Sequence, residues 1–152
     1  MSSARFNTFD RKTIKMNWRL IFVLSLFGLG MAFATVFQIS SASEPFVWLP
    51  IYLLCSYFIA MHAPDKYFLH GFLTSMANCV WITGVHIWLF KTYMTNHIAE
   101  TQQYMKMQAQ HGISVRKTML LMDPVIGIIS GTVLGLLAFA ASKMFGKVKG
   151  IK

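Results

Sequence analysis

Residues 20–39 read LIFVLSLFGLGMAFATVFQI, a run that contains no Lys, Arg, Asp or Glu. Three further runs share this property, and they cover residues 46–63, 68–90 and 124–142. A helix needs about 20 predominantly apolar residues to cross the hydrocarbon core of a bilayer. Backbone in lipid must form its hydrogen bonds internally, and the runs lack the alternation of barrel strands. The sequence therefore predicts an all-α membrane protein with four transmembrane helices.

The composition excludes an ordinary soluble domain. Hydrophobic residues make up 55% of the 152-residue chain and charged residues only 12%, whereas soluble domains carry about 25% charged residues. A chain of this size cannot bury four uninterrupted apolar helices against itself, but a bilayer can cover them. The lipid bilayer is therefore the first expected partner.

The basic residues predict the topology. The net charge is +9, and the Lys and Arg residues gather before the first run and after the last. Together with Lys66 in the second link, they outnumber those of the other two links by ten to four. The positive-inside rule then places both termini in the cytoplasm, with the four helices forming two hairpins. Basic tails beside a membrane contact anionic headgroups, so we expect no nucleic-acid partner.

This topology divides the chain into three parts. Residues 1–18 and 146–152 are predicted to be basic cytoplasmic tails, and residues 19–145 form a single four-helix domain. Its spans are expected at residues 20–39, 46–63, 68–90 and 124–145, with an outer link at residues 91–118.

The outer link contains a candidate helix. Asn96 is a suitable N-cap for a helix that runs from Ile98 towards Gln110, and Gly112 is a suitable stop. Met94, Ile98 and Met105 share roughly one face of it. Two arrangements fit this pattern, a short interfacial helix on the outer membrane surface and a continuation of the third span.

Small residues mark packing faces on the first and fourth spans. Gly127, Gly131 and Gly135 recur every four residues, which lets a neighbouring backbone approach closely. They could form a homodimer interface or pack against the first span, where Gly28 and Ala32 have complementary spacing; we favour the first span. A homo-oligomer or a membrane-protein partner is still expected through another face, because four short helices bury little of each other's surface.

The third span has a polar face. Asn78 and His86 lie on it, whereas Trp81 and Trp88 lie opposite and are expected to face lipid. The face consists of Gly71, Ser75, Asn78, Cys79, Thr83 and His86. Asn78 and His86 could line a polar cavity, bind a ligand or relay a proton. The favoured interpretation is that Asn78 forms hydrogen bonds between helices and that His86 is neutral and near the outer interface.

The acidic residues argue against coupled transport, which usually needs a carboxylate near the midplane. Asp65 and Asp123 are expected at the ends of spans. A pump or secondary transporter is therefore disfavoured.

Two groups of residues have metal-ligating side chains. The outer group, whose thioethers and imidazoles suit Cu(I), consists of His97, Met105, Met107 and His111. The cytoplasmic group, which suits a divalent cation, consists of His62, Asp65 and His70. Methionine is also a flexible apolar residue in contact with lipid, and histidine a polar anchor, and these interpretations are favoured. The sequence therefore predicts no cofactor, with copper as the alternative.

No enzymatic signature is present. No acid stands where it would orient a Ser–His pair, and the chain has no Gly-rich phosphate loop, His-Glu-x-x-His or Cys-x-x-Cys. The sequence thus favours a non-enzymatic accessory, assembly or interaction component of the membrane. The alternatives are a metal-handling membrane protein and a small-solute channel or transporter that uses the polar face of the third span.

Several segments together resemble uncharacterised families of small four-helix bacterial inner-membrane proteins. These segments are Met16–Leu20, Leu26–Phe37, Lys66–Leu73, the pair Asn96-His97, and Gly127–Gly135. The resemblance spans nearly the whole chain from Met16 and implies a four-helix architecture in the bacterial inner membrane. It implies no activity and no site.

Overall fold

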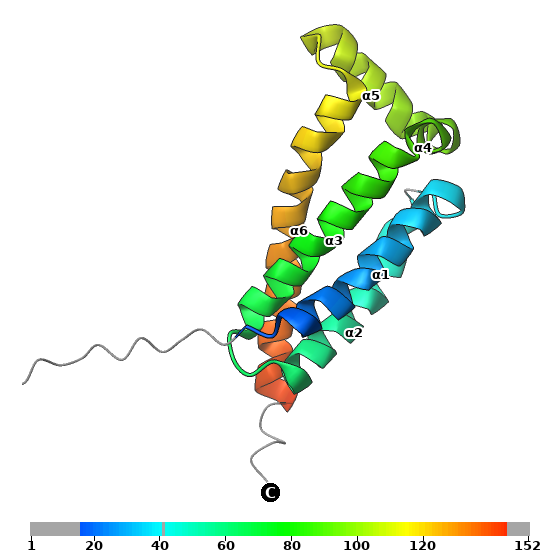
Figure 1. Cartoon of the computed structure of the whole chain (residues 1–152). Helices are drawn as coiled ribbons and strands as arrows, with labels where there is room; N and C mark the ends of the chain where they lie inside the picture. Colours follow the sequence, from blue (N-terminus) through cyan, green and yellow to red (C-terminus); the bar gives the residue numbers. More distant parts are fainter. Residues whose placement is uncertain (1–15, 41, 146–152) are drawn as a thin grey trace, which may run out of the picture.

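A computed structural model describes residues 16–40 and 42–145, and these residues form helices and no strands. The helices are α1 (Trp18–Phe37), α2 (Glu44–His62), α3 (Tyr67–Trp88), α4 (Phe90–Asn96), α5 (Ile98–His111) and α6 (Val115–Phe145). Four of them, α1, α2, α3 and α6, are long and apolar enough to cross a membrane (Figure 1). This confirms the prediction of an all-α protein with four such helices. Of the tails predicted at residues 1–18 and 146–152, residues 1–15 and all of 146–152 lie outside the described residues.

Local chemistry explains several helix ends. The backbone N–H of Leu20 donates to Asn17 Oδ1 at 3.1 Å, which caps α1. Pro45 occupies the first turn of α2, where a missing N–H has no consequence. Gly112 ends α5 with φ of 68°, a conformation that glycine adopts without strain.

Asn96 does not cap α5 as predicted. His97 occupies the N-cap position, and Asn96 Nδ2 instead donates to the carbonyl of Val36 at 2.7 Å. The amide therefore ties the end of α4 to α1, a long-range bond that local sequence cannot reveal.

The last helix is longer than the expected span. It begins at Val115, so Pro124 lies inside α6 and not at its start. At 1.5 Å per residue the helix is about 46 Å long, more than the ~30 Å of hydrocarbon requires. The first turns of α6 can therefore extend beyond the membrane while remaining helical.

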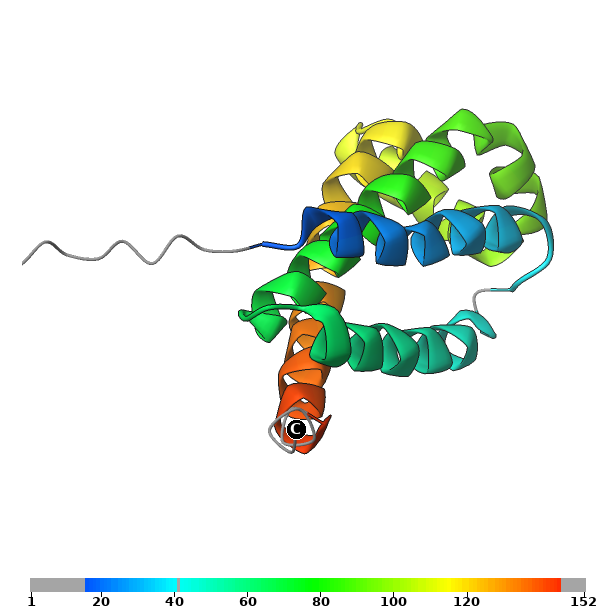
Figure 2. The ribbon, with the colours of Figure 1, turned by 60° about the horizontal axis from the view of Figure 1, so that its bottom comes forward.

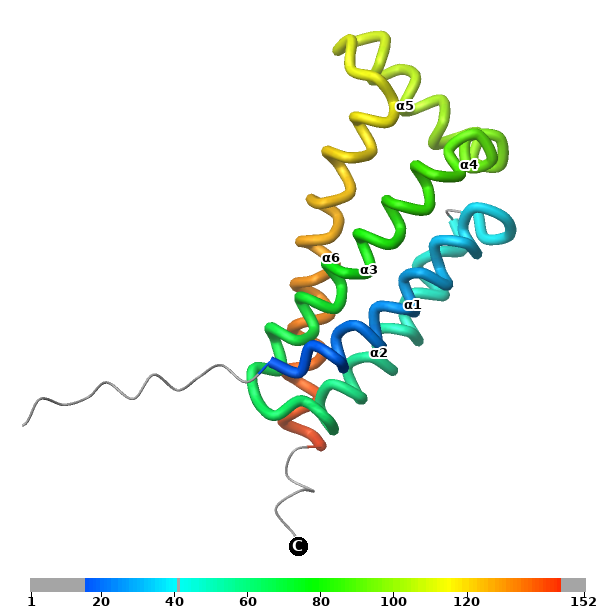
Figure 3. The backbone as a smooth tube through the Cα atoms, viewed as in Figure 1, coloured from blue at the N-terminus to red at the C-terminus, as the bar shows by residue number. Residues whose placement is uncertain are grey.

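Helices α4 and α5 connect α3 to α6. The backbone trace shows α5 crossing from the end of α4 to the start of α6 (Figure 3). It therefore does not continue the third span, one of the two arrangements that the sequence left open.

Helix α3 is the centre of the packing. A Cβ on Gly135 would lie 2.8 Å from the ring of Phe68, and one on Gly71 would lie 2.7 Å from the carbonyl oxygen of Leu134. On the other side of α3, a Cβ on Gly28 of α1 would lie 2.6 Å from Cα of Asn78. The glycines of α6 thus face α3. The expectation that they pack against the first span is wrong.

Helix α2 packs through one half only. Cys55 and Ile59 form an apolar cluster with Leu134 and Ala138 of α6. Towards its start, Leu49 is 59% exposed. Figure 2 shows α2 approaching α6 at the α2 C-terminal end and running away from it elsewhere. This divergence leaves room for a cavity at the other end of the bundle.

Candidate functional site

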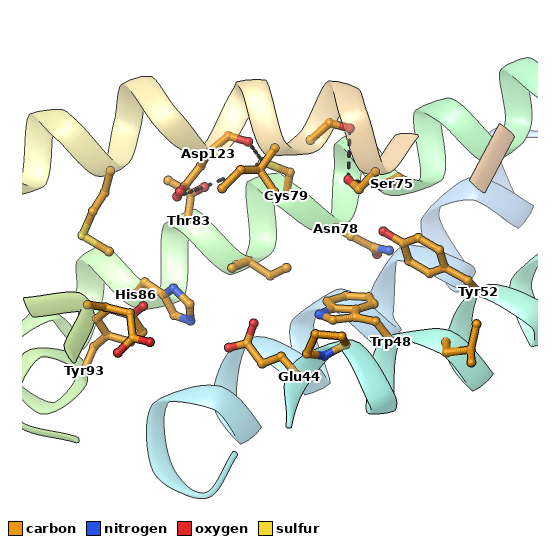
Figure 4. A pocket seen from close by; sticks show the side chains of 18 of the residues that line it. Glu44, Trp48, Tyr52, Ser75, Asn78, Cys79, Thr83, His86, Tyr93 and Asp123 are labelled. Atoms are coloured by element: carbon orange, nitrogen blue, oxygen red, sulfur yellow. Dashed lines mark hydrogen bonds between the residues drawn. The ribbon is translucent and has the colours of Figure 1, made fainter. Parts of the chain in front are cut away.

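A cavity of about 540 Å³ lies between α2, α3 and α6. Glu44 and Trp48 of α2 line one side, and Thr83 of α3 and Asp123 of α6 line the other (Figure 4). Tyr104 of α5 also lines it, next to the outer link. The volume is within the range of small-molecule sites, which are commonly about 300–1,000 Å³.

The polar face of α3 faces this cavity. Five of the six residues predicted to form the face line it, namely Ser75, Asn78, Cys79, Thr83 and His86. Three polar contacts then join α3 to α6: Thr83 Oγ1 donates to Asp123 Oδ2 at 2.7 Å, Cys79 Sγ donates to the Asp123 carbonyl at 3.0 Å, and the hydroxyls of Ser75 and Ser130 lie 2.9 Å apart (Figure 4). The face therefore combines cavity lining with helix–helix bonding by Ser75, Cys79 and Thr83, whereas the interhelical bond that the sequence favours for Asn78 is not formed with any described residue.

The two tryptophans opposite this face differ in environment. Trp88 is 74% exposed, as expected for a side chain that faces lipid. Trp81 instead donates from Nε1 to Ser25 Oγ of α1 at 3.1 Å. Its expected lipid-facing position is wrong, because α1 packs against that side of α3.

Asn78 is the unusual polar residue of the cavity wall. It is 2% exposed, and neither Oδ1 nor Nδ2 has a hydrogen-bond partner among the residues that the structure describes. A buried amide without partners costs about 1–3 kcal/mol. A side chain in this state beside an open cavity is suited to bonding a ligand.

Three rings form a stack near α4, and two of them, His86 and Tyr93, line the cavity. His86 and Tyr93 stack at 4.3 Å between centroids, and Tyr93 and His97 stack at 4.4 Å. His97 Nε2 donates to the carbonyl of Thr35 at 2.6 Å. His86 Nε2 lies 2.9 Å from Thr35 Oγ1. Because that hydroxyl donates to the Ala32 carbonyl, His86 Nε2 is the donor to Thr35.

The phenols near α5 keep their protons. Burial raises the pKa of Tyr93 and of Tyr104, and nearby carboxylates raise both further. Both therefore present neutral hydroxyls at physiological pH.

The acidic residues are unevenly distributed. Asp123 lies inside α6 and is half-buried at the cavity. Glu44 and Glu100 also line the cavity, so three of the five acidic residues of the chain meet there. Within the described part of the chain, no Lys or Arg lines it. The cavity is therefore acidic within a basic protein.

Sequence reasoning missed the wall formed by α2 and α5. Glu44, Trp48 and Tyr52 of that wall recur every four residues, and so do Glu100 and Tyr104. Residues four apart share one face of a helix. This spacing was the available signal, but nothing in it shows that the two stripes face the same cavity.

The two histidines of the proposed cytoplasmic metal site have other bonds. His70 Nε2 accepts from the N–H of Asn17 at 3.0 Å, and His70 Nδ1 donates to the Lys66 carbonyl at 3.1 Å. His62 Nδ1 donates to the Phe58 carbonyl at 3.1 Å. A metal at His70 would have to displace one of its two bonds.

The proposed copper ligands are divided. His97 is buried, whereas Met105 is 59% exposed; Met107 and His111 line a separate cavity of about 190 Å³. Within residues 16–40 and 42–145, no group of three or more His, Cys, Asp or Glu could hold a metal ion. Copper binding, which also involves methionine sulfur, stays a prediction.

In comparisons with known proteins, no family model matches the chain, and no curated protein and no solved structure matches it either.

Proposed function

We propose that this chain is a non-enzymatic, multi-pass membrane protein that binds an amphiphilic small molecule in the cavity between α2, α3 and α6. It would act as a binding component of the membrane, an accessory protein as the sequence favours. The observation that carries the proposal is the cavity itself, because it joins the polar face of α3 to an apolar opening. Leu49 and Ile126 line it and are 59% and 61% exposed.

These exposed side chains support access from the bilayer. Leu49 lies on α2 and Ile126 on α6, both helices that are apolar enough to span a membrane. A ligand could therefore place its polar end against α3 while its apolar part passes between α2 and α6 into lipid. An amphiphile matches both halves of such a site, whereas a fully polar solute would leave the opening exposed to lipid.

For the membrane placement we propose the bacterial inner membrane, two helical hairpins and both termini in the cytoplasm. The distribution of Lys and Arg supports this orientation. Figure 1 is consistent with it, since the start of α1 and the end of α6 lie at the same end of the bundle. The cavity, next to α5 in the outer link, would then lie in the outer half of the membrane.

Filling the cavity tests the proposal. Ile82 is a half-buried residue of α3 that lines the cavity, and Ile82→Trp would occupy part of its volume. Val80→Trp is the matched control, because Val80 lies on the same helix and is 69% exposed. We expect native mass spectrometry from lipid nanodiscs to show an amphiphile retained by the wild type and by V80W, and lost from I82W.

Equal retention by I82W and the wild type would overturn the proposal, as would a wild type that retains nothing. If I82W does not fold, the exposed rim offers a second pair. Ile126→Trp narrows the opening, whereas Ile129→Trp, at a position that is 62% exposed and does not line the cavity, leaves it unchanged.

A further inference from the structure

The acidic character of the cavity points to the chemistry of its ligand. Glu44, Glu100 and Asp123 come from three different helices and line one cavity, in a chain whose net charge is +9. We infer that the cavity selects an amphiphile with an ammonium headgroup, an inference that rests on the proposed binding function. Such a headgroup carries the charge opposite to that of the carboxylates, and its chain fits the apolar opening.

The position of the acids supports a bound cation. Asp123 Oδ2 accepts a hydrogen bond from the Thr83 hydroxyl at 2.7 Å. Figure 4 shows Glu44 on the opposite side of the cavity from Asp123. Charges that face each other across a half-buried space interact more strongly than they would in water. A cation between them relieves the repulsion between like charges, which an anionic or uncharged headgroup cannot do.

Asn78 provides an independent indication of a ligand. Asn78 lines the cavity, and both of its buried amide atoms lack partners among the described residues. Oδ1, a hydrogen-bond acceptor, can lie against the positively charged ammonium group, and Nδ2 can donate to an oxygen next to the headgroup. The unused bonding capacity of a 2% exposed side chain thus lies in the wall that also carries the acids.

The aromatic lining favours an organic cation over a metal ion. Trp48, Tyr52 and Tyr104 line the cavity together with the acids, and aromatic faces attract ammonium groups, most strongly when these are desolvated. A metal ion would need three or more close ligands, and the His, Cys, Asp and Glu of the described ranges provide no such group. Acids that are spread over a cavity of about 540 Å³ suit a cation that is larger than a metal ion and whose charge is more diffuse.

The decisive experiment compares three probes on the full chain in uncharged dodecyl maltoside micelles. Dodecyltrimethylammonium has both the cationic head and the chain, dodecanol has only the chain, and tetramethylammonium has only the head. We expect native mass spectrometry titrations to give a Kd for dodecyltrimethylammonium at least about tenfold lower than for either other probe. In nanodiscs, we expect phosphatidylethanolamine to be retained in preference to phosphatidylglycerol.

Substitutions of the acidic residues test whether the cavity causes the selectivity. Glu44→Gln and Asp123→Asn together should remove the preference for dodecyltrimethylammonium over dodecanol. Asp65→Asn, in the turn between α2 and α3, removes an acid that does not line the cavity and should leave the preference unchanged. Because both substitutions at the cavity are nearly isosteric, circular dichroism should show folded protein.

The outcomes separate this inference from the proposed function. Equal binding of dodecanol and dodecyltrimethylammonium, abolished by I82W, would overturn charge selection and leave the binding function standing. If tetramethylammonium bound as tightly as dodecyltrimethylammonium, the inference that the ligand is an amphiphile would be overturned. Failure of all three probes and of phosphatidylethanolamine, together with identical adducts on the wild type and I82W, would overturn both. Retention of selectivity in the Glu44 and Asp123 double variant would also overturn the inference.

Discussion

A single methyl group at Gly28 should destabilise the protein strongly for its size. A Cβ there would lie 2.6 Å from Cα of Asn78, and this contact joins two backbones, so no side chain can rotate away. The helices would have to separate by about 0.8 Å for the contact to reach the 3.4 Å of ordinary van der Waals packing. Overpacking of this kind costs about 1–3 kcal/mol. We therefore expect Gly28→Ala to lower Tm by about 2–12 °C for a chain of this size.

Gly30→Ala is the matched control, because a Cβ at Gly30, two residues along α1, would have no atom within 4 Å. Replacing a helical glycine by alanine there should be neutral or stabilise α1 by up to about 1 kcal/mol. Thermal unfolding in detergent, followed by circular dichroism, measures both variants. If the Tm of Gly28→Ala lies within 1 °C of that of Gly30→Ala, α1 does not approach α3 as closely as the structure shows. The conclusion that α1 buries Asn78 would then be wrong as well.

Two further predictions concern orientation and charge. A fluorescent protein fused after Lys152 should fluoresce and alkaline phosphatase fused there should be inactive, because the C-terminus is proposed to be cytoplasmic; the reverse pattern would contradict the topology. In single-cysteine variants, Cys79 at the cavity should react about tenfold faster with a cationic methanethiosulfonate than with an anionic one, as expected for an acidic site. Cys55, which is 0% exposed, should react with neither, and equal rates at Cys79 would count against an acidic cavity.

The sequence predicts which residues form helices better than it predicts which helices meet. Runs without charged residues identify the four long helices, and Gly112 ends α5 for a local steric reason. The neighbour of Gly131 cannot be predicted in this way, because a small residue shows only that another part of the chain can come close. In the structure that neighbour is Phe72 of α3. Helix periodicity defines a face, but the element that covers the face depends on how all helices fit together.

The candidate site shows the same limit. The polar face of α3 could be predicted from spacing alone, and Asn78 was already singled out by it. The facing wall, with Glu44 and Trp48, could not, since each residue in isolation looks like an ordinary helix start or an interfacial aromatic. The start of the last helix was predicted too late for a related reason. Pro124 reads as the start of a helix, whereas in the structure α6 already begins at Val115.

Side-chain size along α2 accounts for the position of the cavity. In the second half of the helix, where α2 meets α6, the buried residues are Ile59 and the small residues Cys55, Ser56 and Ala60. The first half carries Trp48 and Tyr52, which are too bulky for the same close approach and form a T-shaped pair at 5.6 Å. Helices with small residues at their contact come closer than helices with large ones. The change from large to small side chains along one helix therefore keeps α2 away from α6 at one end only. The same bulky aromatic residues that hold the helices apart line the space they create, so the shape of the cavity and the cation selectivity proposed for it have one origin.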